Sequence, residues 1–188
     1  MEHPPRNQNN LLLLMIGAGL ILLAVAAFLA LPRAQQTAQT ADFTAVPVAI
    51  NFPAPNIKLT DLQDRPVAFS DYKGQVILYN AWATWCPPCK AEMPVLQAFY
   101  LAHRQEGFVV IAIEDGEPLS DVALFVGDNG LTFPVWPDIK WVATTAFGIG
   151  ALPTSYVIDR SGAARLMWAG AITRDALEQY VTPLLRGN

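Results

Sequence analysis

The start of the chain holds one long uninterrupted apolar stretch, whereas the rest alternates between short apolar runs and polar turns. Residues 11–31 contain no charge over 21 positions, which is long enough to cross a bilayer core. We predict a transmembrane anchor over 11–31, preceded by a tail over 1–10. A cleavable signal peptide is the alternative, but its apolar region runs to about 7–15 residues before a small-x-small site. Here Pro32-Arg33 follows directly, which favours the uncleaved anchor.

The residues after the apolar stretch predict a linker over 32–51 and a folded domain over 52–188. Residues 34–45 of the linker are polar and have no apolar periodicity, so this part suits a tether. One arginine lies on each side of the anchor, Arg6 before it and Arg33 after it, so the positive-inside rule hardly distinguishes the two orientations. His3 and the α-amine tilt the prediction towards a cytoplasmic N-terminus, with the domain outside the cytoplasm.

The domain pattern predicts an α/β fold with a mixed central sheet, because its last two strands form an antiparallel hairpin. Gly107 ends the first helix, Pro94 should kink it, and Ser120 is a candidate N-cap for the second. Predicted strands cover 57–62, 67–69, 76–81, 108–113, 155–159 and 165–168. Predicted helices run from just past Trp85 to Gly107, over 121–126, over 142–147, and from a Thr173 cap to about Leu185.

Composition narrows the classes of function. The net charge is −4 and no Lys/Arg run occurs, so a nucleic-acid partner is not expected, because phosphate binding needs clustered positive charge. Charged residues make up only 15% of the chain. Two cysteines exclude a disulfide-stapled scaffold, and two histidines, His3 and His103, leave little for a metal site.

Both cysteines lie in one motif, Cys86-Pro87-Pro88-Cys89, between a predicted buried strand and a helix. Free N–H groups and the helix dipole favour an anion at a helix N-terminus, so the thiolate form of Cys86 is favoured there. Pro87 and Pro88 suit a first helical turn, where no N–H is needed. We predict that Cys86 is the exposed nucleophile and Cys89 the resolving thiol of a disulfide exchange.

The alternatives for this motif are a zinc half-site and a purely structural disulfide. A closed zinc site needs four ligands, whereas the chain offers Cys86, Cys89 and His103, with His3 beyond the anchor. A structural disulfide over so short a loop would add little stability. We therefore predict redox chemistry, with no metal and no cofactor other than the cysteine pair.

Two segments, AWATWCPPCKAEMP at 81–94 and GIGALPTSYVIDRSG at 148–162, resemble the thioredoxin superfamily. The resemblance is strongest to the membrane-tethered thiol–disulfide oxidoreductases of the bacterial TlpA/ResA kind, and it covers roughly residues 52–181. It implies a thioredoxin-like fold in which Trp85 precedes the nucleophile. Pro153 would be the cis-proline packed against the disulfide, and Leu152 would offer backbone to a substrate peptide. Trp85, Pro87 and Pro88 would border the same substrate site. A trans proline leading a strand is the alternative for Pro153.

Asn80 and Glu92 distinguish between thioredoxin itself and the TlpA/ResA-like proteins as the group that the chain resembles. Thioredoxin carries a buried Asp where this chain has Asn80, which cannot titrate. Glu92 follows Cys89 by one helical turn, and burial would raise its pKa enough to exchange a proton with Cys89. TlpA/ResA-like proteins show the same pairing. The alternative is a solvated helix face for Glu92. For Glu114 and Asp115, at a strand end, we expect a solvated loop. The alternative is a supporting role beside the active site, because α/β folds gather their sites at this edge of the sheet.

The resemblance implies a single-pass protein of the inner (cytoplasmic) membrane whose domain faces the periplasm or cell exterior. It would reduce specific protein disulfides, with electrons from a membrane thiol transporter. Apocytochrome c and a copper-site assembly protein are the implied clients. A disulfide-donating oxidase is one alternative. Another is a copper(I)-binding chaperone of thioredoxin fold, although no histidine follows His103. A peroxidase fits less well, because no separate peroxidatic cysteine exists.

Overall fold

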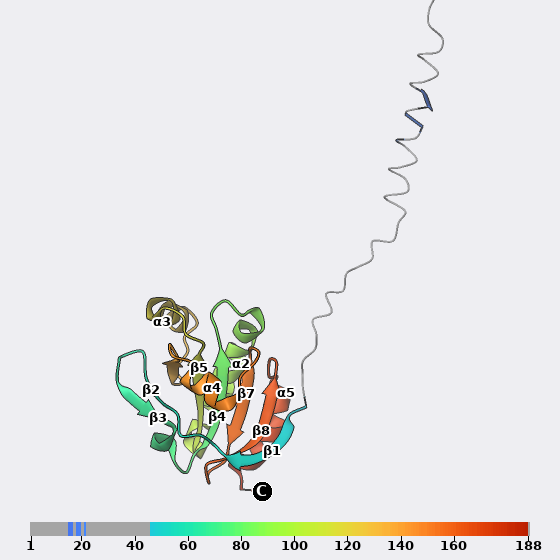
Figure 1. Cartoon of the computed structure of the whole chain (residues 1–188). Helices are drawn as coiled ribbons and strands as arrows, with labels where there is room; N and C mark the ends of the chain where they lie inside the picture. The colour runs from blue at the N-terminus through green and yellow to red at the C-terminus, as the bar shows by residue number, and fades with distance from the viewer. Residues whose placement is uncertain (1–14, 17, 20, 22–45, 188) are drawn as a thin grey trace, which may run out of the picture. The chain divides into compact units, whose positions relative to one another are not determined.

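The computed structural model describes residues 15–16, 18–19, 21 and 46–187. The predicted tail, most of the predicted anchor over 11–31 and the linker as far as residue 45 lie outside the described residues. Among the residues that are described, no helix has the length and apolar character needed to cross a membrane. Residues 46–187 make up the folded domain (Figure 1).

A six-stranded sheet forms the centre of the domain, with the strand order β1-β8-β7-β4-β5-β6. Its strands are β1 (Val48–Pro53), β4 (Val76–Trp82), β5 (Phe108–Glu114), β6 (Val135–Pro137), β7 (Thr154–Ile158) and β8 (Ala163–Ala169). β4, β5 and β6 are parallel, whereas β7, β8 and β1 pair antiparallel with their neighbours. The predicted mixed sheet is therefore confirmed.

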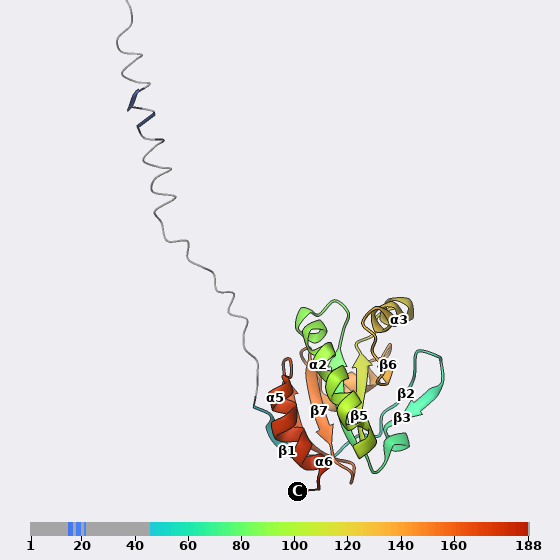
Figure 2. The same ribbon diagram turned by 180° about the vertical axis from the view of Figure 1, so that it is seen from behind.

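Helices cover the sheet on both faces. Figure 2 shows α2 and the C-terminal helices on one face, and Figure 1 shows α4 on the other. A separate two-stranded sheet forms at the side. The helices are α2 (Pro87–His103), α3 (Leu119–Asp128), α4 (Val142–Phe147), α5 (Arg174–Ala176) and α6 (Thr182–Leu185), with short turns η1 (Phe69–Tyr72), η2 (Arg104–Glu106) and η3 (Leu177–Val181). The side sheet pairs β2 (Lys58–Thr60) with β3 (Pro66–Ala68).

Two hydrophobic clusters, one on each face, account for the apolar runs. Leu78 and Trp82 of β4 belong to the cluster under α2, whereas Ile77 and Tyr79 belong to the cluster that contains Phe147 of α4. All seven residues of β4 are buried, because a strand covered on both faces has no solvated side. Alternation places Asn80 on the α2 face, between Leu78 and Trp82.

The edge strands β1 and β6 depart from the sequence prediction. β1 begins at Val48, so four residues of the predicted linker belong to the sheet. Five of its six residues are exposed, since an edge strand that pairs only with β8 leaves no clear apolar pattern. β6 has only three residues, too few to show a period.

Of the two predicted helix N-caps, one is confirmed and the other is wrong. The hydroxyl of Thr173 accepts the Ala176 N–H at 3.3 Å, so the predicted cap of the last helix is confirmed. Ser120 is not an N-cap: α3 starts at Leu119 after Pro118, and the Ser120 hydroxyl donates to Asp121. Helix α2 continues through Pro94 to His103.

Candidate active site

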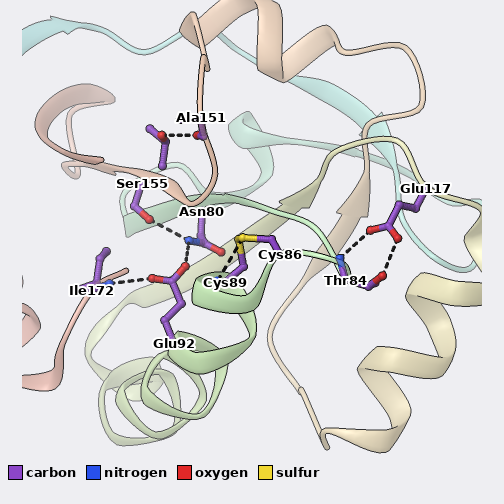
Figure 3. The surroundings of a disulfide bond; sticks show 10 residues. Asn80, Thr84, Cys86, Cys89, Glu92, Glu117, Ala151, Ser155 and Ile172 are labelled. Carbon is purple, nitrogen blue, oxygen red and sulfur yellow. Dashed lines mark hydrogen bonds between the residues drawn. A yellow bond between two sulfur atoms is a disulfide. The ribbon is translucent and has the colours of Figure 1, made fainter. Parts of the chain in front are cut away.

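The two cysteines form a disulfide at the N-terminus of α2 (Figure 3). Their Cα atoms are 5.3 Å apart. Cys86 is the N-cap residue, and its Sγ accepts the N–H of Cys89 at 3.3 Å. Pro87 and Pro88 have no N–H, so the Cys89 N–H is the first that the helix offers to a sulfur at this end. This donor and the helix dipole favour a thiolate at Cys86 once the disulfide is reduced.

Neither sulfur-bearing residue is exposed. Cys86 is 3% exposed and Cys89 is fully buried, so the prediction of an exposed nucleophile is wrong for the disulfide form. The preceding residue, Trp85, is by contrast 63% exposed. Cys86 still lines a surface groove and Cys89 does not, which leaves Cys86 as the cysteine that a client can approach.

The groove beside Cys86 has a volume of about 390 Å³. Three segments far apart in sequence form it: the start of α2, the end of β5 with α4, and the loop before β7. The lining residues are Trp85, Cys86, Pro87, Pro88, Asp115, Thr144, Ile149, Gly150, Ala151 and Leu152. The fold thus brings together Trp85, Pro87, Pro88 and Leu152 from the predicted substrate site.

The loop before β7 contains the only cis peptide bond of the described residues, Leu152–Pro153. The resemblance implied this conformation, and a trans proline is the wrong alternative. Pro153 is buried, and its carbonyl accepts the Gly170 N–H at 2.8 Å. The Thr154 hydroxyl donates to the Ala151 carbonyl at 2.8 Å (Figure 3). The first bond joins the loop to the residue that follows β8, and the second holds it against the first residue of β7.

Glu92 is buried beneath the disulfide-bearing turn and does not lie on a solvated helix face, with 2% of its surface exposed. Its Oε1 accepts an N–H of the Asn80 side chain at 2.8 Å, and its Oε2 accepts the Ile172 N–H at 2.8 Å (Figure 3). Burial raises the pKa of Glu92 to about 7, against the lowering effect of these two hydrogen bonds. Cys89 and Glu92 are three residues apart on α2, and they share one face of the helix.

A family comparison agrees with this geometry. The model of the AhpC/TSA family matches residues 50–167, which include the cysteine pair, Glu92 and Pro153. The chain belongs to the AhpC/TSA family. Within this thioredoxin-like family it is a thiol–disulfide oxidoreductase of the ResA/DsbE type, and its redox group is the Cys86–Cys89 disulfide.

Several relatives and solved structures of this type are similar to the chain. The thiol-disulfide oxidoreductase ResA of Geobacillus thermodenitrificans is 35% identical over 134 residues, covering 71% of this chain and 77% of its own. ResA of Bacillus thuringiensis (strain Al Hakam) is 37% identical over 128 residues, covering 68% and 74%. A putative thiol:disulfide interchange protein DsbE from Chlorobium tepidum superposes with a TM-score of 0.67 at 29% identity, covering 72% of this chain and 96% of its own. A putative thioredoxin from Neisseria meningitidis gives a TM-score of 0.67 at 31% identity, covering 72% and 91%.

A second carboxylate network of this AhpC/TSA-family domain lies at the other side of the active-site turn. Glu117 accepts the Thr84 N–H at 2.6 Å and the Thr84 hydroxyl at 2.5 Å (Figure 3). Glu114 accepts the Glu117 N–H at 3.0 Å. The sequence prediction of a solvated loop is wrong for Glu114, which is fully buried. Burial and the neighbouring Glu117 raise the pKa of Glu114 to about 8.

Sequence reasoning missed Glu117 and Thr84. The only signal for Glu117 is that acidic residues follow the end of a parallel strand, where α/β folds gather their sites. In the described part of the chain, no group of three His, Cys, Asp or Glu side chains is placed to hold a metal ion. His103 packs its ring against Phe99, with centroids 4.3 Å apart, and lies at the far end of α2.

Proposed function

We propose that this protein is a membrane-anchored reductase of specific protein disulfides that works outside the cytoplasm. The observation that carries the proposal is the buried Glu92 below the Cys86–Cys89 turn, held by Asn80 and Ile172. A carboxyl whose pKa is about 7 exchanges protons at neutral pH, where thiol–disulfide exchange needs a proton acceptor. The proposal also includes the client, the direction of electron transfer and the cellular location.

The proposed reaction has two exchanges. The Cys86 thiolate attacks one sulfur of the client disulfide, the client S–S bond breaks, and the leaving client sulfur takes a proton. Glu92 then accepts the proton of Cys89, whose thiolate attacks Cys86 Sγ and releases the second client thiol. Two electrons have passed from the Cys86/Cys89 dithiol to the client, and the enzyme disulfide has formed.

The groove supplies the client site in this proposal. An extended client segment lies between Trp85, Pro87 and Pro88 on one side and the Leu152–Pro153 loop on the other. Neither the N–H nor the carbonyl of Leu152 has a backbone hydrogen bond in the described part of the chain. The N–H and the carbonyl of Leu152 are therefore free to pair with a client backbone, as the family resemblance implies.

The entry of the chain into the sheet supports clients close to a membrane. β1 pairs with β8 so that Val48 lies level with Met167, Tyr156 and Tyr79 across the sheet. β1 then runs antiparallel to β4, away from the edge that bears Cys86 (Figure 1). Residues 46 and 47, which lead into β1, thus lie on the active-site side of Val48. A tether over 32–47 would raise the effective concentration of membrane-proximal clients around Cys86.

The proposed location is the inner membrane, with a single-pass anchor over 11–31 and the domain in the periplasm or at the cell exterior. A membrane thiol transporter would supply the electrons. Apocytochrome c, or a copper-site protein, would be the client. These assignments are supported by the apolar run and by the family resemblance. Protease digestion of intact spheroplasts tests the location: degradation of the domain supports it, and protection overturns it.

The reduction potential tests the direction. The full-length chain is equilibrated in dithiothreitol and glutathione buffers, with the fluorescence of Trp85 as the signal. A potential near or below about −220 mV is expected for a reductase. A value near about −120 mV, in the range of strong oxidants, would overturn reduction in favour of disulfide donation.

Trapping tests the chemistry itself. Cys89→Ser is expected to accumulate a mixed disulfide between Cys86 and an oxidised client protein, whereas Cys86→Ser forms none. Copper(I) titration of the reduced chain separates the chaperone alternative. Tight copper binding with no mixed disulfide would replace the redox proposal.

A further inference from the structure

Three exposed apolar side chains lie close together in sequence, in the turn after β6 and at the first residue of α4. They define what we name the Trp141 patch: Ile139, Trp141 and Val142. They are 51%, 54% and 42% exposed. Because β4, β5 and β6 are parallel, the residues after β6 emerge at the same edge of the sheet as Cys86, which follows β4. Exposed apolar side chains that gather beside a groove are candidates for binding a partner.

The backbone holds Trp141 in an unusual conformation. Its φ of 51° and ψ of 36° lie in the left-handed region, which bulky residues adopt only when the surrounding structure imposes it. Asp138 imposes it here: its carbonyl accepts the Trp141 N–H at 2.9 Å. Its buried carboxylate accepts the N–H groups of Val142, Ala143 and Thr144 at 2.6 to 3.0 Å. Strain of this kind is concentrated at functional sites.

The patch continues the groove of the active site. Thr144 and Asp115 line that groove, and the Thr144 hydroxyl donates to the Asp115 carboxylate at 3.3 Å. The indole lies over the adjacent Gly116, where a Cβ would come within 3.4 Å of Trp141 Nε1. A client leaving the Cys86 end of the groove past Asp115 therefore meets Trp141 next.

We propose that the Trp141 patch binds an apolar side chain of the client polypeptide while Cys86 holds its disulfide, so that Trp141 determines specificity. The proposal rests on the proposed disulfide reductase function and deepens it. Two strand spacings separate β4 from β6, about 10 Å, and about three residues of extended peptide span this distance. The apolar side chain thus lies about three residues from the attacked cysteine. Tryptophan is enriched among residues that dominate binding energy at protein interfaces.

Peptide reduction by the full-length, fully reduced chain tests this assignment. The substrates are Gly/Ser peptides with one internal Cys-x-x-Cys disulfide and a single Phe placed three residues before or after the pair, or Ser at both positions. Each turnover passes two electrons from the Cys86/Cys89 dithiol to the peptide disulfide and leaves the enzyme disulfide. We expect one of the two Phe peptides, the one whose Phe reaches the Trp141 patch, to be reduced with about tenfold higher kcat/KM than the Ser peptide.

The variants separate binding from folding. Trp141→Asn removes the indole but keeps a residue that tolerates the left-handed region, and it should bring the Phe/Ser ratio close to one through KM. Trp141→Phe should retain most of the preference. Leu101→Ser, a matched exposed site near the far end of α2, should leave the ratio unchanged. All four proteins should reduce oxidised glutathione at equal rates.

Three results would overturn the assignment. The first is an equal rate for Phe and Ser peptides with the wild type, and the second is an unchanged ratio in Trp141→Asn. The third is concentration-dependent dimerisation that Trp141→Asn abolishes, which would assign the patch to a second copy of the chain. Failure to reduce any peptide or glutathione disulfide would instead refute the reductase function itself.

Discussion

The side-chain amide of Asn80 donates to Glu92 Oε1 at 2.8 Å and to Ser155 Oγ at 2.9 Å, inside the core below the disulfide. The three residues come from β4, α2 and β7, and all are buried. Asn80 cannot titrate, so it stabilises the charged form of Glu92 without competing for the proton. Its own Oδ1 has no hydrogen-bond partner in the described part of the chain. The arrangement leaves Glu92 as the group that responds to pH at this position.

Burial of Glu92 predicts a loss of stability as pH rises. The pKa of Glu92 is about 7 in the folded domain against an ordinary value of 4.5, so the folded state binds more protons between these values. The contribution of Glu92 to stability is largest below pH 4.5, falls as pH rises to about 7, and is lost above that pH. The shift corresponds to about 3 kcal/mol. Urea unfolding of the oxidised protein at several pH values measures it, and Glu92→Gln should flatten the curve. Parallel curves for the two proteins would contradict the prediction.

The same carboxyl predicts the pH profile of the reaction. Only the carboxylate of Glu92 accepts the Cys89 proton, so resolution of the mixed disulfide should accelerate as pH rises through about 7. In Glu92→Gln this rise should disappear, and the rate at pH 8 should fall about a hundredfold, the scale of general-base catalysis. Stopped-flow fluorescence measures the rate. Glu178→Gln, at an exposed position, is the control. An equal loss of rate in that variant would show that Glu92 is not the acceptor of the Cys89 proton.

Replacing Asn80 should move that profile. Asn80→Leu keeps the volume but removes the hydrogen bond that favours the charged form of Glu92, so the pKa of Glu92 should rise above its wild-type value. The midpoint of the pH–rate profile then moves to higher pH. Ser155→Ala leaves the Asn80–Glu92 bond in place and should keep the wild-type midpoint. A shift to lower pH in Asn80→Leu would show that Asn80 does not act through Glu92.

Thr84 predicts a stability effect at the active-site turn. Thr84→Val keeps the branched shape but removes the hydroxyl that donates to Glu117, leaving a partly buried carboxylate oxygen without its donor. We expect a loss of about 2 kcal/mol in the free energy of unfolding, since hydrogen bonds to charged groups contribute about 1.5–3 kcal/mol. Thr132→Val removes an exposed hydroxyl that bonds Gln97 and should cost less than about 0.5 kcal/mol. Similar losses in the two variants would exclude a special anchoring effect of Glu117.

Local sequence determined the elements that carry the chemistry. The apolar run over 76–81 is buried on both faces as β4, the helix over 142–147 is present with these bounds, and Thr173 caps the last helix. A redox function could be assigned to Cys86 and Cys89 because the signal is local in sequence: two cysteines three residues apart, between a strand and a helix. Such features depend on backbone propensity and nearest neighbours, which the sequence contains directly.

Tertiary structure decided how completely the charged side chains are buried. The helical position of Glu92 left a solvated face open as an alternative, and Glu114 at the end of β5 was expected in a solvated loop, yet segments distant in the chain cover both. Ile172, 80 residues after Glu92, supplies one of its two hydrogen bonds. The burial that shifts a pKa, the placement of β1 on β8 and the left-handed Trp141 each depend on elements that meet only in the folded domain. Sequence periodicity reports the face that a residue occupies, but the packing of other elements determines whether water reaches it.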